Sequence, residues 1–282
     1  MSYEDWIGRS TESETVLTAA PAAALAATFD RGDTTVEEGD ILPPGWHVLY
    51  FRQVARLSET GEEGHPRRGG FMPPVRLQRM MWSSHSLTFL RPLRIGERCR
   101  RVSRIVDIRE LDTEAGPVCS VTTNNEISGE DGLAMFEERA SVFRDPPPAD
   151  APPPVKLRVP QSPPWRRTIR PNTVLLFRFS ALTLNSHRIH YDRSYAMEVE
   201  RYPGLVFHGS LTLLLLLELL RDSLDGVSPK TFSAHAIPPH YEPLFDNADV
   251  ELLGEPSPDG NRVRLWARNG DGLATMEATA EI

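Results

Sequence analysis

Several features that mark other classes of protein are scarce or absent in this 282-residue sequence. Only two cysteines occur, so no framework of disulfide bonds can hold the fold together. The longest apolar run, in LTLLLLLELL, is interrupted by Glu218, far short of the roughly 20 residues that a membrane span needs. The first ten residues, MSYEDWIGRS, lack the apolar core of a secretory signal. We therefore expect a cytoplasmic, reduced protein that does not associate with membranes.

Positive charge is also in short supply. The chain has 31 Lys and Arg against 39 Asp and Glu, a net charge of −8, and no basic face that would favour nucleic acid. The exception is RRGGFMPPVRLQR, residues 67–79, which carries four arginines and no acid. This local charge is enough for a small phosphorylated ligand and too little for a duplex.

Proline is abundant in one place, DPPPADAPPPVKLRVPQSPP at residues 145–164. Proline fixes φ and removes backbone donors, so this stretch can join neither a helix nor a central strand. It predicts an extended linker. We divide the chain into an N-terminal domain over 1–145, a linker over 146–164 and a C-terminal domain over 165–282.

The C-terminal domain contains one unusually apolar helix. The sequence SLTLLLLLELLRDSL, residues 210–224, has leucines on every face, which predicts a helix that is buried all round. Before it, TVLLFRFSAL (173–182) mixes β-branched and aromatic residues and predicts a strand, and Asp192 is a predicted N-cap for RSYAMEVE. After it come the strand-like segments KTFSAHAIP, ADVELLGE, RVRLWARN and LATMEATAEI. A buried helix followed by antiparallel strands predicts a hot-dog fold.

The first half gives a fainter version of the same order. The segment AAALAATFD parallels FSALTLN, and LPPGWHVLYFRQVAR parallels PGLVFHGSLTLLLL, before three strand-like segments. We predict an α+β double hot-dog, with two antiparallel sheets that each wrap around a central helix and join in a pseudo-dimer. RGDTTVEEGD replaces HRIHYD, so the first half has no counterpart of His190. The alternative is that the halves share only a helix-then-strands pattern.

The densest group of polar residues is NSHRIHYD, residues 185–192, which could form a proton-transfer site, a metal site or a surface turn. The imidazole of His190 suits proton transfer near neutral pH. Asn185 has no titratable proton and can only orient a water molecule. A metal site would use His187, His190, His208, His235 and Asp192, but no recognisable zinc spacing completes a ligand set. We therefore predict no metal.

The segment FSALTLNSHRIHYDRSYA, followed by YPGLVFHGSL, resembles the signature of MaoC-like enoyl-CoA hydratases and dehydratases. It is most similar to the branch with 3-methylfumaryl-CoA (mesaconyl-4-CoA) hydratases, itaconyl-CoA hydratases and type-2 3-hydroxyacyl-thioester dehydratases. GHPRRGGFMPPVRLQRMMW resembles the N-terminal domain of that branch. Two departures lie in the motif itself: Asn185 stands where the broader family has an aspartate, and His187-Arg188 replaces Asn-Pro. Ser83-Ser84-His85 replaces a small, glycine-rich turn, and His235 a common arginine.

The resemblance implies reversible hydration of a short branched dicarboxylic enoyl-CoA, mesaconyl-4-CoA or itaconyl-CoA, without a cofactor, since the coenzyme A thioester is the substrate. His190 would transfer the protons, helped by Asn185 and by free N–H groups at Gly209, the start of the helix; Asp30 or Asp192 could assist. Arg188 would bind a substrate carboxylate, or else pair with an acid of the protein. The further expected substrate-binding residues are Ser210, His208, Arg67, Arg68, Gly70, Phe71, Arg79 and Trp82.

Three other functions stay open. One is dehydration of 3-hydroxyacyl chains on acyl carrier protein in fatty-acid synthesis. Thioester hydrolysis on the same fold needs a carboxylate, and Asn185 speaks against it. The third is a catalytically silent acyl-thioester-binding module. In each case we expect a homo-oligomer, a dimer of double hot-dogs.

Overall fold

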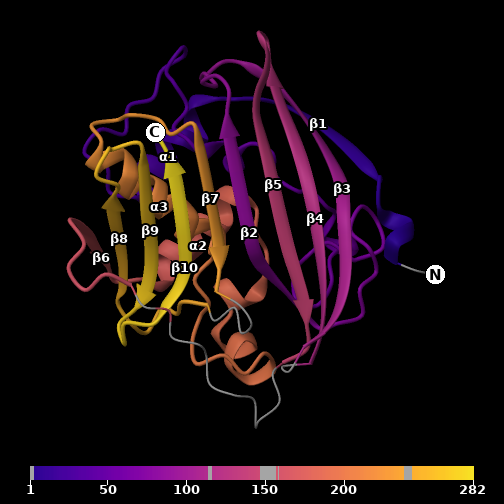
Figure 1. The fold of residues 1–282 in the computed structure, drawn as a ribbon. Helices are drawn as coiled ribbons and strands as arrows, with labels where there is room; N and C mark the ends of the chain where they lie inside the picture. Colours follow the sequence, from indigo (N-terminus) through magenta and orange to yellow (C-terminus); the bar gives the residue numbers. More distant parts are fainter. Residues whose placement is uncertain (1–2, 114–115, 147–156, 158, 238–242) are drawn as a thin grey trace.

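The strands of the chain form one continuous antiparallel sheet. The computed structural model describes residues 3–113, 116–146, 157, 159–237 and 243–282. Ten strands lie side by side in the order β1-β3-β4-β5-β2-β7-β10-β9-β8-β6, and the helices gather on one side of the sheet (Figure 1). The strands are β1 (Ser10–Val16), β2 (Arg79–Phe89), β3 (Arg98–Thr113), β4 (Gly116–Gly129), β5 (Gly132–Arg144), β6 (Trp165–Ile169), β7 (Thr231–Ala236), β8 (Val250–Pro256), β9 (Arg262–Asn269) and β10 (Ala274–Glu281).

The two halves of the sheet meet at β2 and β7, which pair from Ser84 opposite His235 to Thr88 opposite Thr231. Strands β1 to β5 come from the first half of the sequence and β6 to β10 from the second, so the halves join edge to edge as expected. This closes two edges that would otherwise present unpaired backbone groups. The domain boundaries stay a prediction, and most of the predicted linker (147–156 and 158) lies outside the described residues.

The leucine-rich helix forms as predicted and lies at the centre of the core. Helix α3 spans Gly209–Ser223, and every residue from Leu211 to Leu220 is buried. Glu218 is the one charged residue within this buried stretch, and its carboxylate accepts hydrogen bonds from Trp46 Nε1 at 3.0 Å and Arg221 Nη2 at 2.6 Å; Arg31 also binds it. A buried carboxylate is tolerated only with such partners. The core cluster around α3 includes side chains of both halves.

The strand predicted over 173–182 is wrong, because these residues form helix α2 (Thr173–Thr183). The side chain of Asn172 accepts a hydrogen bond from Leu175 N–H at 2.9 Å and so caps the helix. Leu176 and Phe179 face the core, whereas Phe177 is 62% exposed. This helical spacing, together with the cap, outweighs the strand preference of the β-branched and aromatic side chains.

The first half departs from the prediction of a central helix for each sheet. Helix α1 (Ala19–Thr28) does match α2, and left-handed residues follow both helices, Asp30 with φ 50° and Leu184 with φ 53°. The expected second long helix is, among the described residues, only the 3₁₀ turn η2 (Trp46–Leu49). Gly45, which precedes it at φ 85°, lies against α3, and a Cβ there would be 2.6 Å from Leu214. The single helix α3 therefore occupies the space near this turn.

Candidate active site

The NSHRIHYD segment is a tightly hydrogen-bonded loop that follows α2. Asn185 Oδ1 accepts a hydrogen bond from the backbone N–H of His187 at 3.1 Å, and a short 3₁₀ turn, η4 (Arg188–His190), comes next. Asp192 then accepts from the backbone N–H of Tyr195 at 3.1 Å, at the start of the π-helical turn η5 (Tyr195–Val199). The predicted N-cap role of Asp192 is confirmed. These contacts fix the histidines of the loop in place.

His190 is held as a neutral base. Its ring is buried, and Nδ1 lies 2.8 Å from the carbonyl oxygen of Val206. A carbonyl only accepts, so Nδ1 carries the proton and Nε2 keeps its lone pair. Burial lowers the pKa of His190 to about 4, although the bond to Val206 acts in the opposite direction. The side chain predicted to transfer protons is therefore in its basic form at neutral pH.

His208 packs against one face of the His190 ring. The two imidazoles are stacked, with ring centroids 3.7 Å apart and planes 18° from parallel. His208 Nε2 is 2.8 Å from Ser180 Oγ, and Nδ1 is buried with no hydrogen-bond partner in the part of the chain that the structure describes. Burial, with His190 and His187 nearby, holds the pKa of His208 well below its ordinary value. Because His208 is neutral, it packs against the His190 ring without placing a positive charge beside it.

Two further histidines extend this pair into a row. The His187 ring meets His190 edge-on, at 5.5 Å and 87°, and His65 of the first half lies 4.3 Å from His187. Burial lowers the pKa of His65 to about 4 and that of His187 well below its ordinary value. From the sequence, His187 was expected only as a metal ligand, and His65, more than 100 residues away in the GHPRRGGFMPPVRLQRMMW segment, was given no role. We call these four side chains the histidine row.

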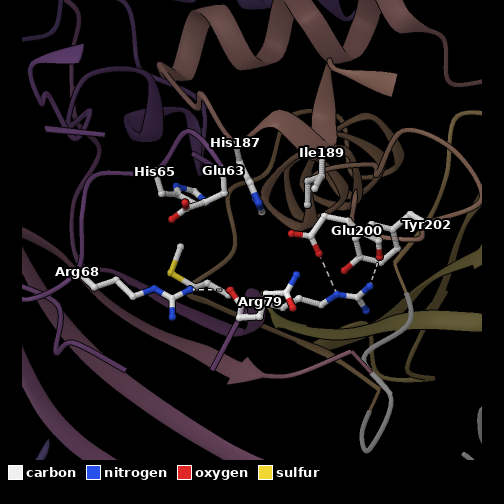
Figure 2. Close-up of a pocket in the computed structure, with 10 residues that line it drawn as sticks. Glu63, His65, Arg68, Arg79, His187, Ile189, Glu200 and Tyr202 are labelled. Atoms are coloured by element: carbon white, nitrogen blue, oxygen red, sulfur yellow. Dashed lines mark hydrogen bonds and ion pairs between the residues drawn. The ribbon is translucent and has the colours of Figure 1, made fainter. Parts of the chain in front are cut away.

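A small pocket opens at one end of the histidine row. Figure 2 shows the His187 ring pointing into this pocket, with Arg68 and Arg79 on the other side. Both halves of the chain contribute to it. The lining residues are Glu63, His65, Arg68, Gln78, Arg79, Met80, His187, Ile189, Glu200 and Tyr202. Only Arg68 and Arg79 were expected among the substrate-binding residues; the other lining residues were not, although several of them lie in the segments that carry the resemblance.

The start of α3 lies beside the histidine row because its N-cap residue is His208. The first bond to that cap runs from the Thr212 N–H to the His208 carbonyl at 3.0 Å, so the N–H groups of Gly209 and Ser210 precede the helical ladder. A Cβ on Gly209 would lie 3.0 Å from the side chain of Trp82 in β2. The structure thus brings Trp82, Gly209 and His208 together, and their role in binding substrate stays a prediction.

The arginines expected to bind substrate occupy different positions. Arg188 Nη2 pairs with Asp192 Oδ2 at 2.8 Å, and the guanidinium covers the Tyr195 ring at 4.2 Å. Its pairing with an acid of the protein, the alternative left open by the sequence, is therefore the observed one. Arg79 Nε pairs with Glu200 Oε2 at 3.0 Å. Arg67 is exposed and donates to the Thr60 carbonyl at 3.3 Å.

Two of the expected substrate-binding residues, Gly70 and Phe71, lie elsewhere. The Gly70 carbonyl accepts a hydrogen bond from Trp6 Nε1 at 3.3 Å, and Phe71 packs against a separate hydrophobic cluster that contains Trp6. Neither lines the pocket, because the turn at 69–73 folds toward the N-terminal residues. Asp30 is exposed. Asn185 is partly buried, and its bond to the His187 backbone uses one of the two lone pairs on Oδ1.

The metal alternative finds no support in the geometry. Within the residues that the structure describes, no group of three or more His, Cys, Asp or Glu side chains is placed to hold a metal ion. The rings of the histidine row stack and meet edge-on, whereas zinc ligands converge on a common point.

In the same described part of the chain, no helix is long and apolar enough to cross a membrane.

Two solved structures of low sequence identity share this double hot-dog fold. A MaoC-like dehydratase from Phytophthora capsici aligns with 97% of this chain and 95% of its own, at a TM-score of 0.68 and 13% identity. A conserved hypothetical protein from Mycobacterium tuberculosis, described as a double hot-dog fold, covers 99% and 98%, at a TM-score of 0.56 and 15% identity. These two likenesses confirm the predicted fold class.

The sequence comparison identifies the family. The model of hydroxyacyl-thioester dehydratase type 2 matches residues 45–242. The mesaconyl-C(4)-CoA hydratase of Chloroflexus aurantiacus is 41% identical over 279 residues, which is 98% of this chain and 96% of that protein. The chain belongs to the hydroxyacyl-thioester dehydratase type 2 family of hydro-lyases, and the resemblance seen in the sequence motif is confirmed.

Proposed function

We propose that this protein catalyses the reversible hydration of a short branched dicarboxylic enoyl-CoA, mesaconyl-C4-CoA or itaconyl-CoA, to the hydroxyacyl-CoA. The observation that carries the proposal is the neutral His190, fixed by Val206 and stacked on His208 at the start of α3. The choice of substrate follows the Chloroflexus relative, whose name states that it acts on mesaconyl-C(4)-CoA and which matches nearly the whole chain.

The reaction needs one group that both accepts and returns a proton. His190 Nε2 takes a proton from water while the water oxygen bonds to the β-carbon of the enoyl group. In mesaconyl-C4-CoA, whose C=C bond is conjugated with the thioester, the π electrons move through the α-carbon to the thioester oxygen, which becomes an enolate. The imidazolium of His190 then protonates the α-carbon, which restores the thioester carbonyl and the neutral base. One histidine is sufficient, because the proton gained is the proton returned.

The enolate oxygen needs hydrogen-bond donors that are already in place. The Gly209 and Ser210 N–H groups at the positive end of the α3 dipole supply them. Asn185 cannot take part in proton transfer, and it orients the loop by bonding to the His187 backbone. The ring of His187 lines the pocket, and its unprotonated nitrogen can accept a hydrogen bond from the attacking water.

Dehydration of a 3-hydroxyacyl thioester on acyl carrier protein is the second candidate, and the name of the family model favours it. The chemistry is the same reaction in the opposite direction, so the carrier and the chain distinguish the two. A catalytically silent thioester-binding module stays the alternative of another class. The homo-oligomer and the cytoplasmic location expected from the sequence are also part of this proposal.

The test is a hydration assay that follows loss of the enoyl-thioester absorbance with mesaconyl-C4-CoA, itaconyl-CoA, crotonyl-CoA and long-chain enoyl-CoAs. We expect the highest kcat/KM for a dicarboxylic substrate. Preference for long neutral chains, or for the acyl-carrier-protein thioester, would instead support the dehydratase of fatty-acid synthesis. Binding without turnover for every substrate would favour the silent module.

A further inference from the structure

Arg68 is the one cation lining the pocket that has no acidic partner among the described residues. Its neighbour Arg79 is neutralised by Glu200. Arg68 instead donates to three backbone carbonyls: Nη1 to Val75 at 2.7 Å and to Leu77, and Nη2 to Gln78 at 2.9 Å. Carbonyl oxygens satisfy hydrogen bonds but carry no net charge. The positive charge of this half-buried guanidinium therefore remains available to a ligand.

The geometry leaves a defined part of the guanidinium open. An arginine has five N–H donors, and the three carbonyls use two on Nη1 and one on Nη2. The Nε–H and one Nη2–H have no partner in the described part of the chain. Guanidinium N–H pairs bind carboxylates in a bidentate way. The Phe143 ring, 4.8 Å from the guanidinium carbon, further restricts its plane.

The surroundings suit an acyl group with a negative end. His65 and His187 are held neutral, since burial lowers the pKa of both, so Arg68 is the cation in this pocket that no ion pair of the described residues occupies. Met80 and Ile189 add apolar surface to the same pocket. Glu63 also lines it and attracts Arg68 at longer range, without an ion pair between them in the described residues. A phosphate of coenzyme A is the other possible anion, but it lies at the far end of the pantetheine chain from the reacting carbons.

We infer that Arg68 binds the free carboxylate of the acyl chain and thereby selects dicarboxylic over neutral enoyl-CoA substrates. This inference rests on the proposed function and assigns its specificity to a residue other than Arg188, whose guanidinium is occupied by Asp192. The carboxylate enters beside His187, which lies next to His190 in the histidine row. We expect the reacting double bond of a short acyl chain then to lie toward His190.

The experiment compares two substrates of nearly equal shape, mesaconyl-C4-CoA and 3-methylcrotonyl-CoA, in which a methyl group replaces the free carboxylate. Arg68→Gln keeps donors for the backbone carbonyls and removes the charge. We expect its kcat/KM for mesaconyl-C4-CoA to fall by about 30-fold or more, as for removal of one partner of a buried charged pair. Its kcat/KM for 3-methylcrotonyl-CoA should stay within about threefold of the wild type.

Arg68→Lys keeps the charge but lacks the paired N–H groups of the guanidinium, so its loss of kcat/KM on mesaconyl-C4-CoA should be smaller than that of Arg68→Gln. The lysine variant also tests the inference if the glutamine variant does not fold. Arg104→Gln, at an exposed position in β3, is the matched control and should leave both substrates unaffected. An equal loss on both substrates, or no loss on either, contradicts the inference while the hydratase activity stands. A wild-type protein that hydrates neither substrate overturns the proposed function itself.

Discussion

The protonation state of His190 follows from its burial and from one backbone contact. Nδ1 donates to the Val206 carbonyl, and burial lowers the pKa of the ring to about 4. A histidine with its ordinary pKa near 6.5 would lose half of its basic form at that pH. The structure therefore keeps this base unprotonated at pH values at which an ordinary histidine would be protonated.

This separation predicts the acid limb of the pH profile. The active form of His190 is neutral, and the pKa of about 4 means that it persists well below pH 6.5. We expect kcat/KM for mesaconyl-C4-CoA to stay nearly constant as the pH is lowered to about 5 and to decline only below that, since kcat/KM reports the pKa values of the free enzyme. A half-maximal point near pH 6.5 would contradict the buried, neutral base.

The entry of α3 is the element on which the proposed enolate site depends. Gly209 begins this helix without a Cβ, and the Trp82 side chain of β2 fills the space that a Cβ would need. The contact between Gly209 and Trp82 thus links the two halves of the chain at the N–H groups proposed to bind the enolate oxygen. Elsewhere in a helix, alanine would be preferred to glycine by about 1 kcal/mol, so the glycine here reflects the close approach of Trp82.

The contact can be tested with a double-mutant cycle. Gly209→Ala should lower the free energy of unfolding by about 1–3 kcal/mol, because the added methyl group overpacks the site, and should reduce kcat by shifting the helix start. In a Trp82→Ala background the space is free, so the same alanine should cost little or nothing. Urea unfolding of the four proteins measures the coupling; equal costs of Gly209→Ala in both backgrounds would show that Trp82 is not the cause.

The molecule as a whole holds several histidines neutral, four of them in its interior and His65 at the pocket. Burial lowers the pKa of His65, His85 and His190 to about 4, and His187 and His208 are shifted in the same direction. In the unfolded chain these groups titrate near 6.5. Between that pH and about 4 the unfolded state binds more protons than the folded state, so acidification favours unfolding.

We therefore expect the free energy of unfolding to fall steeply as the pH is lowered from about 6.5 toward 4.5. Each buried histidine contributes up to about 1.4 kcal/mol per pH unit in this window. The measurement is Tm or urea unfolding at a series of pH values. His85→Gln, which removes one such group from the interior of the first half, should make the dependence shallower. A Tm that is unchanged between pH 7 and pH 5, within about 1 °C, would show that these groups are not held neutral.

The extent to which the sequence predicted this molecule differs between its parts. The leucines of α3 lie on every face of the helix, and turn residues separate the strand-like segments. Both of these patterns were therefore unambiguous in the sequence. The segment 173–182 was assigned to the wrong class, because its strand-forming side chains masked the cap at Asn172. The missing helix of the first half could not be foreseen, since the space near the turn at Trp46–Leu49 is taken by α3, far away in the sequence.

For the site, the local motif predicted what lies within one segment. His190, Asn185 and Gly209 stand at fixed spacings in a familiar pattern and occupy the loop and helix start as expected. The contacts of His65 and Arg68 depend instead on how the first half folds over the loop, and no spacing encodes that. The pairing of Arg188 with Asp192 was likewise one of two open choices, because the residue types allow both.

The most direct test of the proposed mechanism is the turnover of His190→Gln with mesaconyl-C4-CoA. Glutamine can still donate to the Val206 carbonyl but cannot carry a proton, and His235→Gln, on the exposed side of β7, is the matched control. We predict that kcat of the His190 variant falls by about 10²- to 10⁴-fold with the fold intact by circular dichroism, and that the control retains wild-type activity. A His190→Gln protein within about threefold of the wild-type kcat would contradict the assignment of this imidazole as the catalytic base.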